Sequence, residues 1–142
     1  MQPGITTAEL DEIGAAVLRR HRARSAPKLV YGCPTANLIS VNDQIVHGLP
    51  GMRRLQAGDV VKLDVTAELD GYMADAATTV VLPGGRTAAI RLRDCAVAAF
   101  DAGARLLRRG SGFLKLGALS SGSSRQTVAR QESLSASLRK TE

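Results

Sequence analysis

The strongest pattern in the chain is an alternation of apolar and polar residues that begins at position 60. Apolar residues occupy positions 61, 63, 65 and 67, and polar residues occupy positions 62, 64, 66 and 68. This period of two is typical of a β-strand with one solvated face. β-Branched and small residues at 72–82 predict a second long strand. Asp70 and Gly71 lie between the two strands and favour a tight hairpin turn, because both of its central positions need a positive φ.

The turn fixes the register of this predicted hairpin. With the turn at positions 70 and 71, the numbers of paired residues sum to 141. Asp75 then faces Thr66, and Asp64 is the diagonal neighbour of Asp75 on the same face. Diagonal neighbours have α-carbons about 7–8 Å apart, and from there two carboxylates could hold divalent ions about 3.5–4 Å apart. An ordinary solvated sheet face also accounts for these acids, and two carboxylates leave a two-metal site short of ligands.

Two stretches with a helical period flank the hairpin. The first is predicted over residues 7–22, where Thr6 and Glu9 can form a capping box, and its apolar stripe is Leu10, Ile13, Gly14 and Val17. The second is predicted over residues 86–109, with Gly110 as its stop. It is expected to pack on the apolar face of the hairpin through Ile90, Val97, Phe100, Ala104 and Leu107.

Loops and short strands are predicted between the first helix and the hairpin. Residues 25–34 contain two prolines and predict a connector, and residues 37–46 predict two short strands around Asn42 and Asp43. His47 follows in a loop rich in glycine and proline, which fixes the backbone and leaves the imidazole free to face a cleft.

Composition is typical of a globular protein of the cytoplasm. The length of 142 residues suffices for one domain or for a fragment of a larger one. No apolar run is long enough to cross a membrane, and the first residues do not resemble a signal peptide. Cys33 and Cys95 lack the spacing of a disulfide framework or a zinc knuckle.

The net charge of +6 suggests nucleic acid as a partner, but the distribution of the charge along the chain weakens this hypothesis. Residues 1–110 carry 14 basic and 11 acidic side chains, whereas residues 111–142 carry 5 and 2. Aromatic residues for base stacking are few, and no DNA binding is expected. Serine occurs twice in residues 1–110 and eight times in residues 111–142, so this tail is predicted to be disordered. A non-catalytic module that contacts RNA or an acidic partner through the basic tail stays open as a function.

Four blocks, by their order and spacing, resemble the methionine aminopeptidases. They are Pro-Gly-Ile-Thr-Thr-Ala-Glu-Leu-Asp at 3–11, Ser-Val-Asn-Asp-Gln-Ile-Val-His-Gly-Leu-Pro-Gly at 40–51, Gly-Asp-Val-Val-Lys-Leu-Asp-Val at 58–65 and Asp-Gly-Tyr-Met-Ala-Asp at 70–75. The resemblance covers residues 3 to about 110 and implies the N-terminal half of a pita-bread fold. That fold is an α+β arrangement, and this half would consist of antiparallel β-hairpins packed against two helices. A proline-specific peptidase of the same fold is an alternative that fits the second block less well.

The resemblance also implies roles for individual residues. Asp64 would chelate one ion of a pair of divalent metals (Co, Mn, Fe or Zn), Asp75 would bridge both ions, and His47 would contact the scissile amide. Cys33 and Leu38 would contact the substrate, at positions where the family often has an aromatic residue and usually a cysteine. The implied reaction removes the N-terminal methionine of nascent peptides, which would place the protein near the ribosome.

The resemblance stops at about residue 110, before the family's remaining ligands. Three of the five expected metal ligands, a histidine and two glutamates, have no counterpart, so the chain is expected to be inactive or incomplete. The predicted domains are a partial methionine aminopeptidase-like domain over 1–110 and a Ser/Arg-rich tail over 111–142. Residues 115–122 could be encoded by codons that spell Glu-Ile-Gly-Arg-Ala-Val-Glu-Arg in another frame, which resembles the family's continuation. A frameshift, a truncation and an unrelated tail all stay open.

Overall fold

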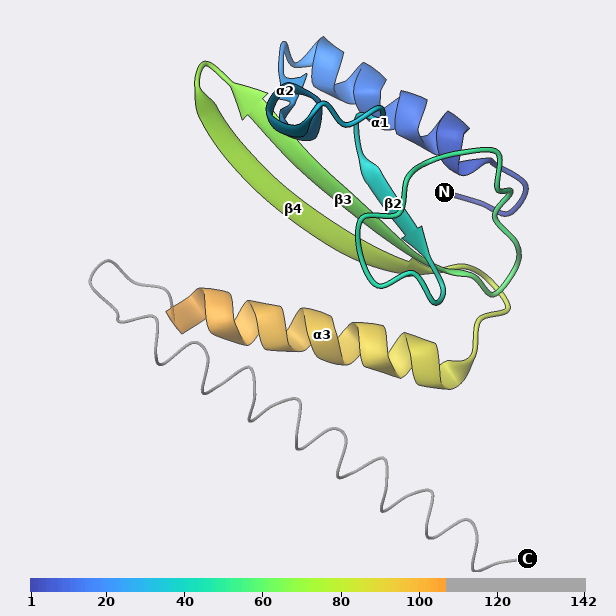
Figure 1. Cartoon of the computed structure of the whole chain (residues 1–142). Coiled ribbons are helices and arrows are strands. Elements are labelled where there is room, and N and C mark those ends of the chain that lie inside the picture. Colours follow the sequence, from blue (N-terminus) through green and yellow to red (C-terminus); the bar gives the residue numbers. More distant parts are fainter. Residues whose placement is uncertain (107–142) are drawn as a thin grey trace, which may run out of the picture. The chain divides into compact units, whose positions relative to one another are not determined.

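The computed structural model describes residues 1–106 (Figure 1). These residues belong to two units, Met1–Ala89 and a second that begins at Ile90, within helix α3 (Thr87–Leu106). Helix α3 begins one residue after its predicted start. Its predicted end at Gly110 and the predicted tail over 111–142 lie outside the described residues. Within residues 1–106, no helix combines the length and the apolar content that crossing a membrane requires.

The first unit is built on a four-stranded antiparallel sheet with β3 (Val60–Leu69) at its centre. Strand β4 (Tyr72–Val81) pairs with β3 along its full length and occupies one of its edges. The other edge is therefore shared by β2 (Leu38–Val41) and the two-residue β1 (Arg24–Ser25). This arrangement confirms the α+β class predicted from the sequence.

The long hairpin has the predicted register. Its turn residues Asp70 and Gly71 have φ of 52° and 87°, as a turn with two left-handed central residues requires. Thr66 pairs with Asp75, and Asp64 pairs with Ala77. The sum rule drawn from the turn residues therefore holds along the whole ladder.

The two faces of the sheet differ in character, because directly paired residues point to the same side. One face carries the core, and helix α1 (Thr7–Arg20), which contacts β1 and β2, covers it (Figure 1). The core residues are Leu10, Ile39, Val41, Leu55, Val61 and Leu82. The opposite face, called the site face below, carries Arg24, Leu38, Ser40, Lys62, Asp64, Thr66, Glu68 and Asp75.

Helix α1 begins at the predicted capping box. The backbone N–H of Thr6 donates to Glu9 Oε2 at 2.7 Å, and the N–H of Glu9 donates to Thr6 Oγ1 at 3.1 Å. Two of the free amides at the helix start are thereby satisfied.

The predicted stripe on this helix is wrong at two of its four positions. Ile13 and Val17 are 54% and 53% exposed, whereas Leu10 and Leu18 are buried. The side of the helix that carries Leu10 and Leu18 faces the core. Gly14 packs closely against the side chain of Asn37, which precedes β2, and this contact sets the rotation of the helix.

The connector predicted over residues 25–34 is also wrong, because it contains strand β1 and helix α2 (Ala26–Tyr31). Pro27 lies in the first turn of this helix, where its missing N–H costs nothing. Gly32 ends the helix with a φ of 64°, a conformation that glycine adopts without a Cβ clash.

Only the first of the two short strands predicted over residues 37–46 forms. Asn42 leaves the strand with a φ of 54°. Its Oδ1 accepts the N–H of Val60 at 2.9 Å, and its Nδ2 donates to Asp59 at 2.8 Å. The side chain thus caps the end of β2, and residues 43–46 leave the sheet as a loop.

Candidate functional site

The sheet brings the two predicted metal ligands to one face. Asp64 on β3 and Asp75 on β4 are diagonal neighbours, because their direct partners are Ala77 and Thr66. Asp64 is half-buried and Asp75 is exposed to solvent. The two carboxylates can therefore lean toward a common point above the site face.

Thr66 holds one of these carboxylates. Its hydroxyl donates to Asp75 Oδ1 at 2.8 Å, directly across the strand pair. This bond orients the carboxylate and leaves Oδ2 of Asp75 available for a second interaction. The predicted register already placed the two residues opposite each other, but a supporting role for the threonine was missed.

The loop that bears His47 is anchored to β2 through Gly48. The N–H of Ile39 donates to Gly48 O at 2.7 Å, and the N–H of Gly48 donates to Ser40 Oγ at 3.1 Å. A Cβ at position 48 would collide with the carbonyl oxygen of Ile39. Only glycine fits so close to the strand, so this residue fixes where the neighbouring His47 lies.

Two further contacts hold the ends of the same loop. Lys62 Nζ donates to the carbonyl of Ile45 at 2.9 Å. At the other end of the loop, Gly51 and the Thr7 hydroxyl exchange hydrogen bonds of 2.9 and 3.0 Å. Because Lys62 and Ser40 both belong to the site face, the loop lies on the side of the sheet that carries Asp64 and Asp75.

His47 itself has an uncommon backbone conformation, with a φ of 56°. Histidine visits this left-handed region more often than most residues, but single residues held there concentrate at functional sites. Its side chain is exposed. The anchored loop therefore presents the imidazole to solvent on a fixed backbone.

Of the two predicted substrate-contacting residues, Leu38 lies in the sheet beside Asp64 and Cys33 lies outside the sheet. Leu38 is the direct cross-strand partner of Asp64, and its side chain shares the site face. Cys33 is half-buried in the segment between α2 and β2, where its Sγ lies 3.5 Å from the hydroxyl of Thr35.

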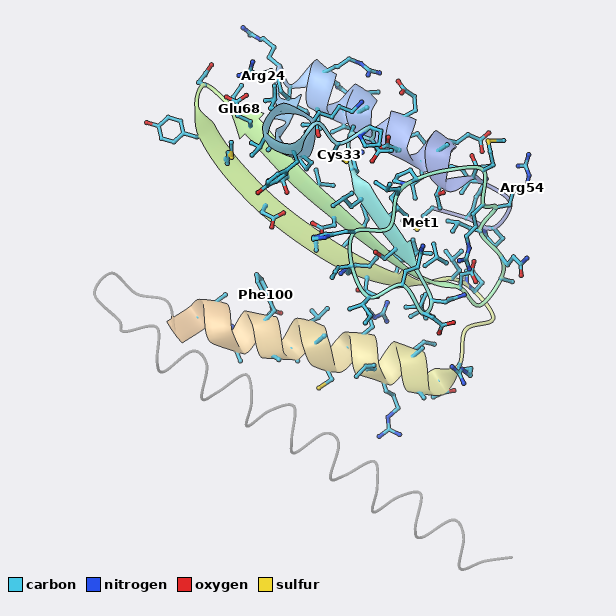
Figure 2. All side chains as sticks on the ribbon, in the orientation of Figure 1. Met1, Arg24, Cys33, Arg54, Glu68 and Phe100 are labelled. Atoms are coloured by element: carbon cyan, nitrogen blue, oxygen red, sulfur yellow. The ribbon has the colours of Figure 1, made fainter. Side chains whose placement is uncertain are left out.

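Glu68, predicted as a solvated acid of this face, is instead 4% exposed. Its carboxylate accepts from Arg24 Nε at 2.6 Å and from the N–H of Gly71 at 2.8 Å (Figure 2). The hydrogen bond from Arg24, followed by that from Gly71, lowers the pKa of Glu68 below its usual value. Glu68 therefore joins β1 to the hairpin turn and is a structural acid.

The described residues do not fit a complete dinuclear metal centre. In residues 1–106, no group of three histidine, cysteine, aspartate or glutamate side chains is placed to hold an ion. Asp64 and Asp75 supply two carboxylates, and a two-metal centre needs further oxygen or nitrogen ligands.

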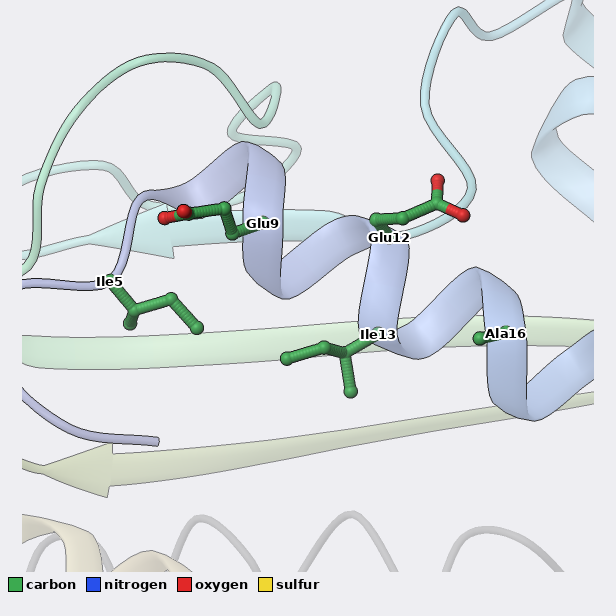
Figure 3. A pocket seen from close by; sticks show the side chains of 5 residues that line it. All are labelled: Ile5, Glu9, Glu12, Ile13 and Ala16. Carbon is green, nitrogen blue, oxygen red and sulfur yellow. The ribbon is translucent and has the colours of Figure 1, made fainter.

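An open hollow of about 490 Å³ lies elsewhere, along helix α1 (Figure 3). It contains none of the predicted site residues. Its lining consists of Ile5, Glu9, Glu12, Ile13 and Ala16. The polar groups on the site face are therefore the stronger candidate for chemistry.

Known proteins share both the sequence and the fold of this chain. Residues 1–126 match metallopeptidase family M24. Methionine aminopeptidase 2 of Bacillus subtilis is 41% identical over 110 residues, which are 77% of this chain and 44% of that protein. A methionine aminopeptidase of Staphylococcus epidermidis is 36% identical over 118 residues, 82% of this chain and 47% of that protein.

Solved structures agree with the sequence match. Methionine aminopeptidase from Rickettsia prowazekii superposes with a TM-score of 0.81 at 27% identity, over 89% of this chain and 51% of that one. A prolidase from Pyrococcus horikoshii shares the fold alone, with a TM-score of 0.72 at 14% identity, over 89% of this chain and 35% of that one. The chain spans about half the length of the methionine aminopeptidases that it matches. It therefore belongs to metallopeptidase family M24, as a homologue of roughly the N-terminal half of the methionine aminopeptidases, and its α+β fold matches part of their pita-bread structure.

Proposed function

We propose that this chain carries one wall of a methionine aminopeptidase site, with Asp64 and Asp75 as metal ligands and His47 on the substrate side. Two observations support this proposal. Asp64 and Asp75 share the site face by their register, and Ser40 and Lys62 of the same face bond to Gly48 and Ile45 in the loop that bears His47. Homology to methionine aminopeptidases supports the reaction class.

The proposed substrate is a peptide with a free N-terminal methionine. Leu38 offers an apolar side chain directly beside Asp64, so a methionine side chain could pack next to a metal ligand. Cys33, in the segment that precedes β2, would contact the same methionine side chain through its polarisable sulfur. The exposed imidazole of His47 would bind the amide group that follows the first residue.

The proposed metal ions are divalent, and Co, Mn, Fe and Zn all suit carboxylate and imidazole ligands. Residues 1–106 do not complete a two-metal centre, and the histidine and two glutamates that the resemblance implies have no counterpart in this chain, so Asp64 and Asp75 would supply only part of the ligand set. Asp64 and Asp75 would then hold the ions against the sheet, with Thr66 orienting Asp75.

A peptidase assay tests the proposal on the full chain. Purified protein is incubated with a Met-Ala-Ser peptide and Mn²⁺ or Co²⁺, and released methionine is measured. Because three of the five expected metal ligands have no counterpart in this chain, we expect no release above background. We expect metal binding that is weakened in Asp75→Asn but kept in Glu12→Gln, which changes an exposed acid on α1. Equal metal binding in wild type and Asp75→Asn would contradict the proposed site, and metal-dependent release of methionine would contradict the expected inactivity.

A second candidate is a binding module for RNA, and the arginine-rich end of α1 favours it. Arg19 pairs with Glu12 and Arg24 pairs with Glu68, whereas Arg20 and Arg22 extend into solvent. The basic tail over residues 111–142, which would also contact RNA, lies outside the described residues. Salt-sensitive RNA binding that is lost on deleting residues 111–142, without metal uptake, would favour this function over the peptidase.

A further inference from the structure

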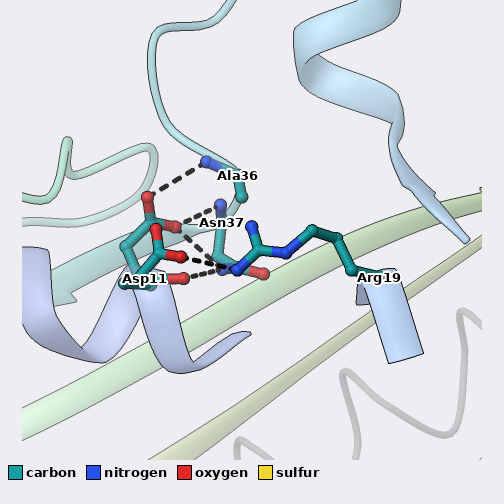
Figure 4. Close-up of polar contacts among 5 residues, drawn as sticks. Asp11, Arg19, Ala36 and Asn37 are labelled. Atoms are coloured by element: carbon teal, nitrogen blue, oxygen red, sulfur yellow. Dashed lines mark hydrogen bonds and ion pairs between the residues drawn. The ribbon is translucent and has the colours of Figure 1, made fainter. Parts of the chain in front are cut away.

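Asp11 on helix α1 holds the segment that precedes β2 (Figure 4). Its Oδ2 accepts the backbone N–H of Ala36 at 3.1 Å, and its Oδ1 accepts the backbone N–H of Asn37 at 2.7 Å. The side-chain amide of Asn37 donates back to Asp11 Oδ1 at 2.8 Å and to its carbonyl at 3.1 Å. One carboxylate thus fixes two consecutive peptide groups and one side chain.

Asn37, the partner of Asp11, is tightly packed. Asn37 is 1% exposed, and a Cβ at Gly14 would lie 2.9 Å from its Cγ and closer still to its Nδ2. Within residues 1–106, Oδ1 of Asn37 is buried and has no hydrogen-bond partner. A buried oxygen without a partner carries a desolvation cost.

The segment held by Asp11 carries the proposed substrate contacts. The hydroxyl of Thr35 donates to the carbonyl of Asn37 at 3.0 Å and lies 3.5 Å from Cys33 Sγ. Leu38 follows Asn37 directly and faces Asp64 across the sheet. A shift at Ala36 and Asn37 would therefore move both Cys33 and Leu38.

We propose that Asp11 is a positioning residue that sets the place of Cys33 and Leu38 relative to Asp64. This inference rests on the proposed peptidase function, because it assigns Cys33 and Leu38 to the wall that receives the first residue of the substrate. Asp11 lies on the core side of the sheet, and within residues 1–106 its carboxylate bonds to Ala36 and Asn37.

The test uses the full chain and two variants that break the same contact from opposite sides. Asp11→Asn replaces one acceptor oxygen with a donor, and Gly14→Ala pushes on Asn37. The matched control is Glu68→Gln, which weakens another buried carboxylate with two donors, at the hairpin turn. Hydrogen exchange of the Ala36 and Asn37 amides and alkylation of Cys33 by iodoacetamide report the local effect.

We expect the hydrogen-exchange rate of the Ala36 and Asn37 amides and the alkylation rate of Cys33 to rise by about tenfold in Asp11→Asn and in Gly14→Ala. The loss of hydrogen bonds to a charged group predicts a change of this size. In Glu68→Gln both rates should stay at the wild-type value even where global stability falls equally. The Kd of a Met-Ala-Ser peptide should rise in Asp11→Asn and stay at the wild-type value in Glu68→Gln.

Three results would overturn this role. Wild-type exchange and alkylation rates in Asp11→Asn would show that the carboxylate holds nothing in place, and equal acceleration in Glu68→Gln would show a global effect. Faster local rates with an unchanged Kd for the peptide would reduce Asp11 to a structural residue. If the wild-type chain binds neither Mn²⁺ nor the peptide, the proposed function fails, while a wild-type exchange rate in Asp11→Asn would refute the inference itself.

Discussion

The hydroxyl of Thr66 donates a 2.8 Å hydrogen bond to the carboxylate of Asp75, the residue directly opposite it in the β3–β4 register. The bond engages Oδ1 and restricts rotation of the carboxylate about its χ angles. Supporting partners of this kind tune metal ligands in many proteins, and their loss typically lowers metal affinity by about 10–100-fold.

Thr66→Val should therefore weaken Mn²⁺ binding by about tenfold or more. The substitution keeps a β-branched side chain in the strand, so the unfolding midpoint should change little. Isothermal titration calorimetry measures the affinity, with Thr79→Val on the same face of β4 as the control. Equal Mn²⁺ affinities for wild type and Thr66→Val would refute the supporting role.

Gly48→Ala should destabilise the first unit by about 1–3 kcal/mol, the usual cost of overpacking. The new methyl group would press on the carbonyl of Ile39 and on Ser40 Cα, 2.9 Å away, neither of which can yield without bending β2. Urea unfolding measures the change. Gly51→Ala is the matched control, because nothing lies within 4 Å of a Cβ there, and similar losses in both variants would contradict the close approach.

His47→Asn should weaken binding of the Met-Ala-Ser peptide and leave metal affinity unchanged. Asparagine tolerates the φ of 56° at this position, so the backbone of the loop is kept while the imidazole is removed. A peptide titration in the presence of Mn²⁺ and a parallel Mn²⁺ titration measure the two affinities. A variant that binds the peptide as tightly as wild type would remove His47 from the proposed site.

Folding stability should fall when the pH drops below about 4, near the unfolded pKa values of Asp and Glu. The pKa of Glu9 is lowered mainly by the backbone N–H of Thr6, and that of Glu68 mainly by Arg24. Burial raises the pKa of Asp59, but hydrogen bonds from Gln56 and Asn42 together with the charge of Arg53 lower the pKa overall.

Each of these groups binds fewer protons folded than unfolded near pH 4, so the stability they add is present above their unfolded pKa values. It is lost as the pH falls through the folded ones. Urea titrations at pH 7 and pH 3 measure the difference, which should shrink in Glu68→Gln because amide 68 no longer titrates. An unchanged pH dependence in that variant would contradict the assignment for Glu68.

Local rules predicted much of this fold correctly. The capping box at Thr6 and Glu9 and the turn at Asp70 and Gly71 depend on neighbouring residues alone, so sequence specifies both. The register followed from the turn and placed Asp64 and Asp75 on one face. Helix α2 was missed although its proline start and glycine stop were visible, because its six residues are too few for a periodic signal.

Features that depend on partners distant in sequence were not predictable in this way. Glu68 and Asp64 are both polar positions in the alternating pattern of β3. Glu68 is a buried acid because Arg24 on β1 pairs with it, and this pairing joins residues far apart in sequence. The buried side of α1 is likewise set by Asn37, which follows the helix by more than a dozen residues. The site face was predicted, but the anchors of the His47 loop were not.

The most direct test of the central claim is whether Asp64 and Asp75 bind metal as one site. Mn²⁺ titrations followed by electron paramagnetic resonance compare the wild-type full chain with Asp64→Asn, Asp75→Asn and the double variant. If the carboxylates share an ion, each single substitution should weaken binding by about tenfold or more, and their effects should not add, as expected for coupled residues. Wild-type binding no tighter than that of the double variant would contradict the claim that these two aspartates form one wall of a metal site.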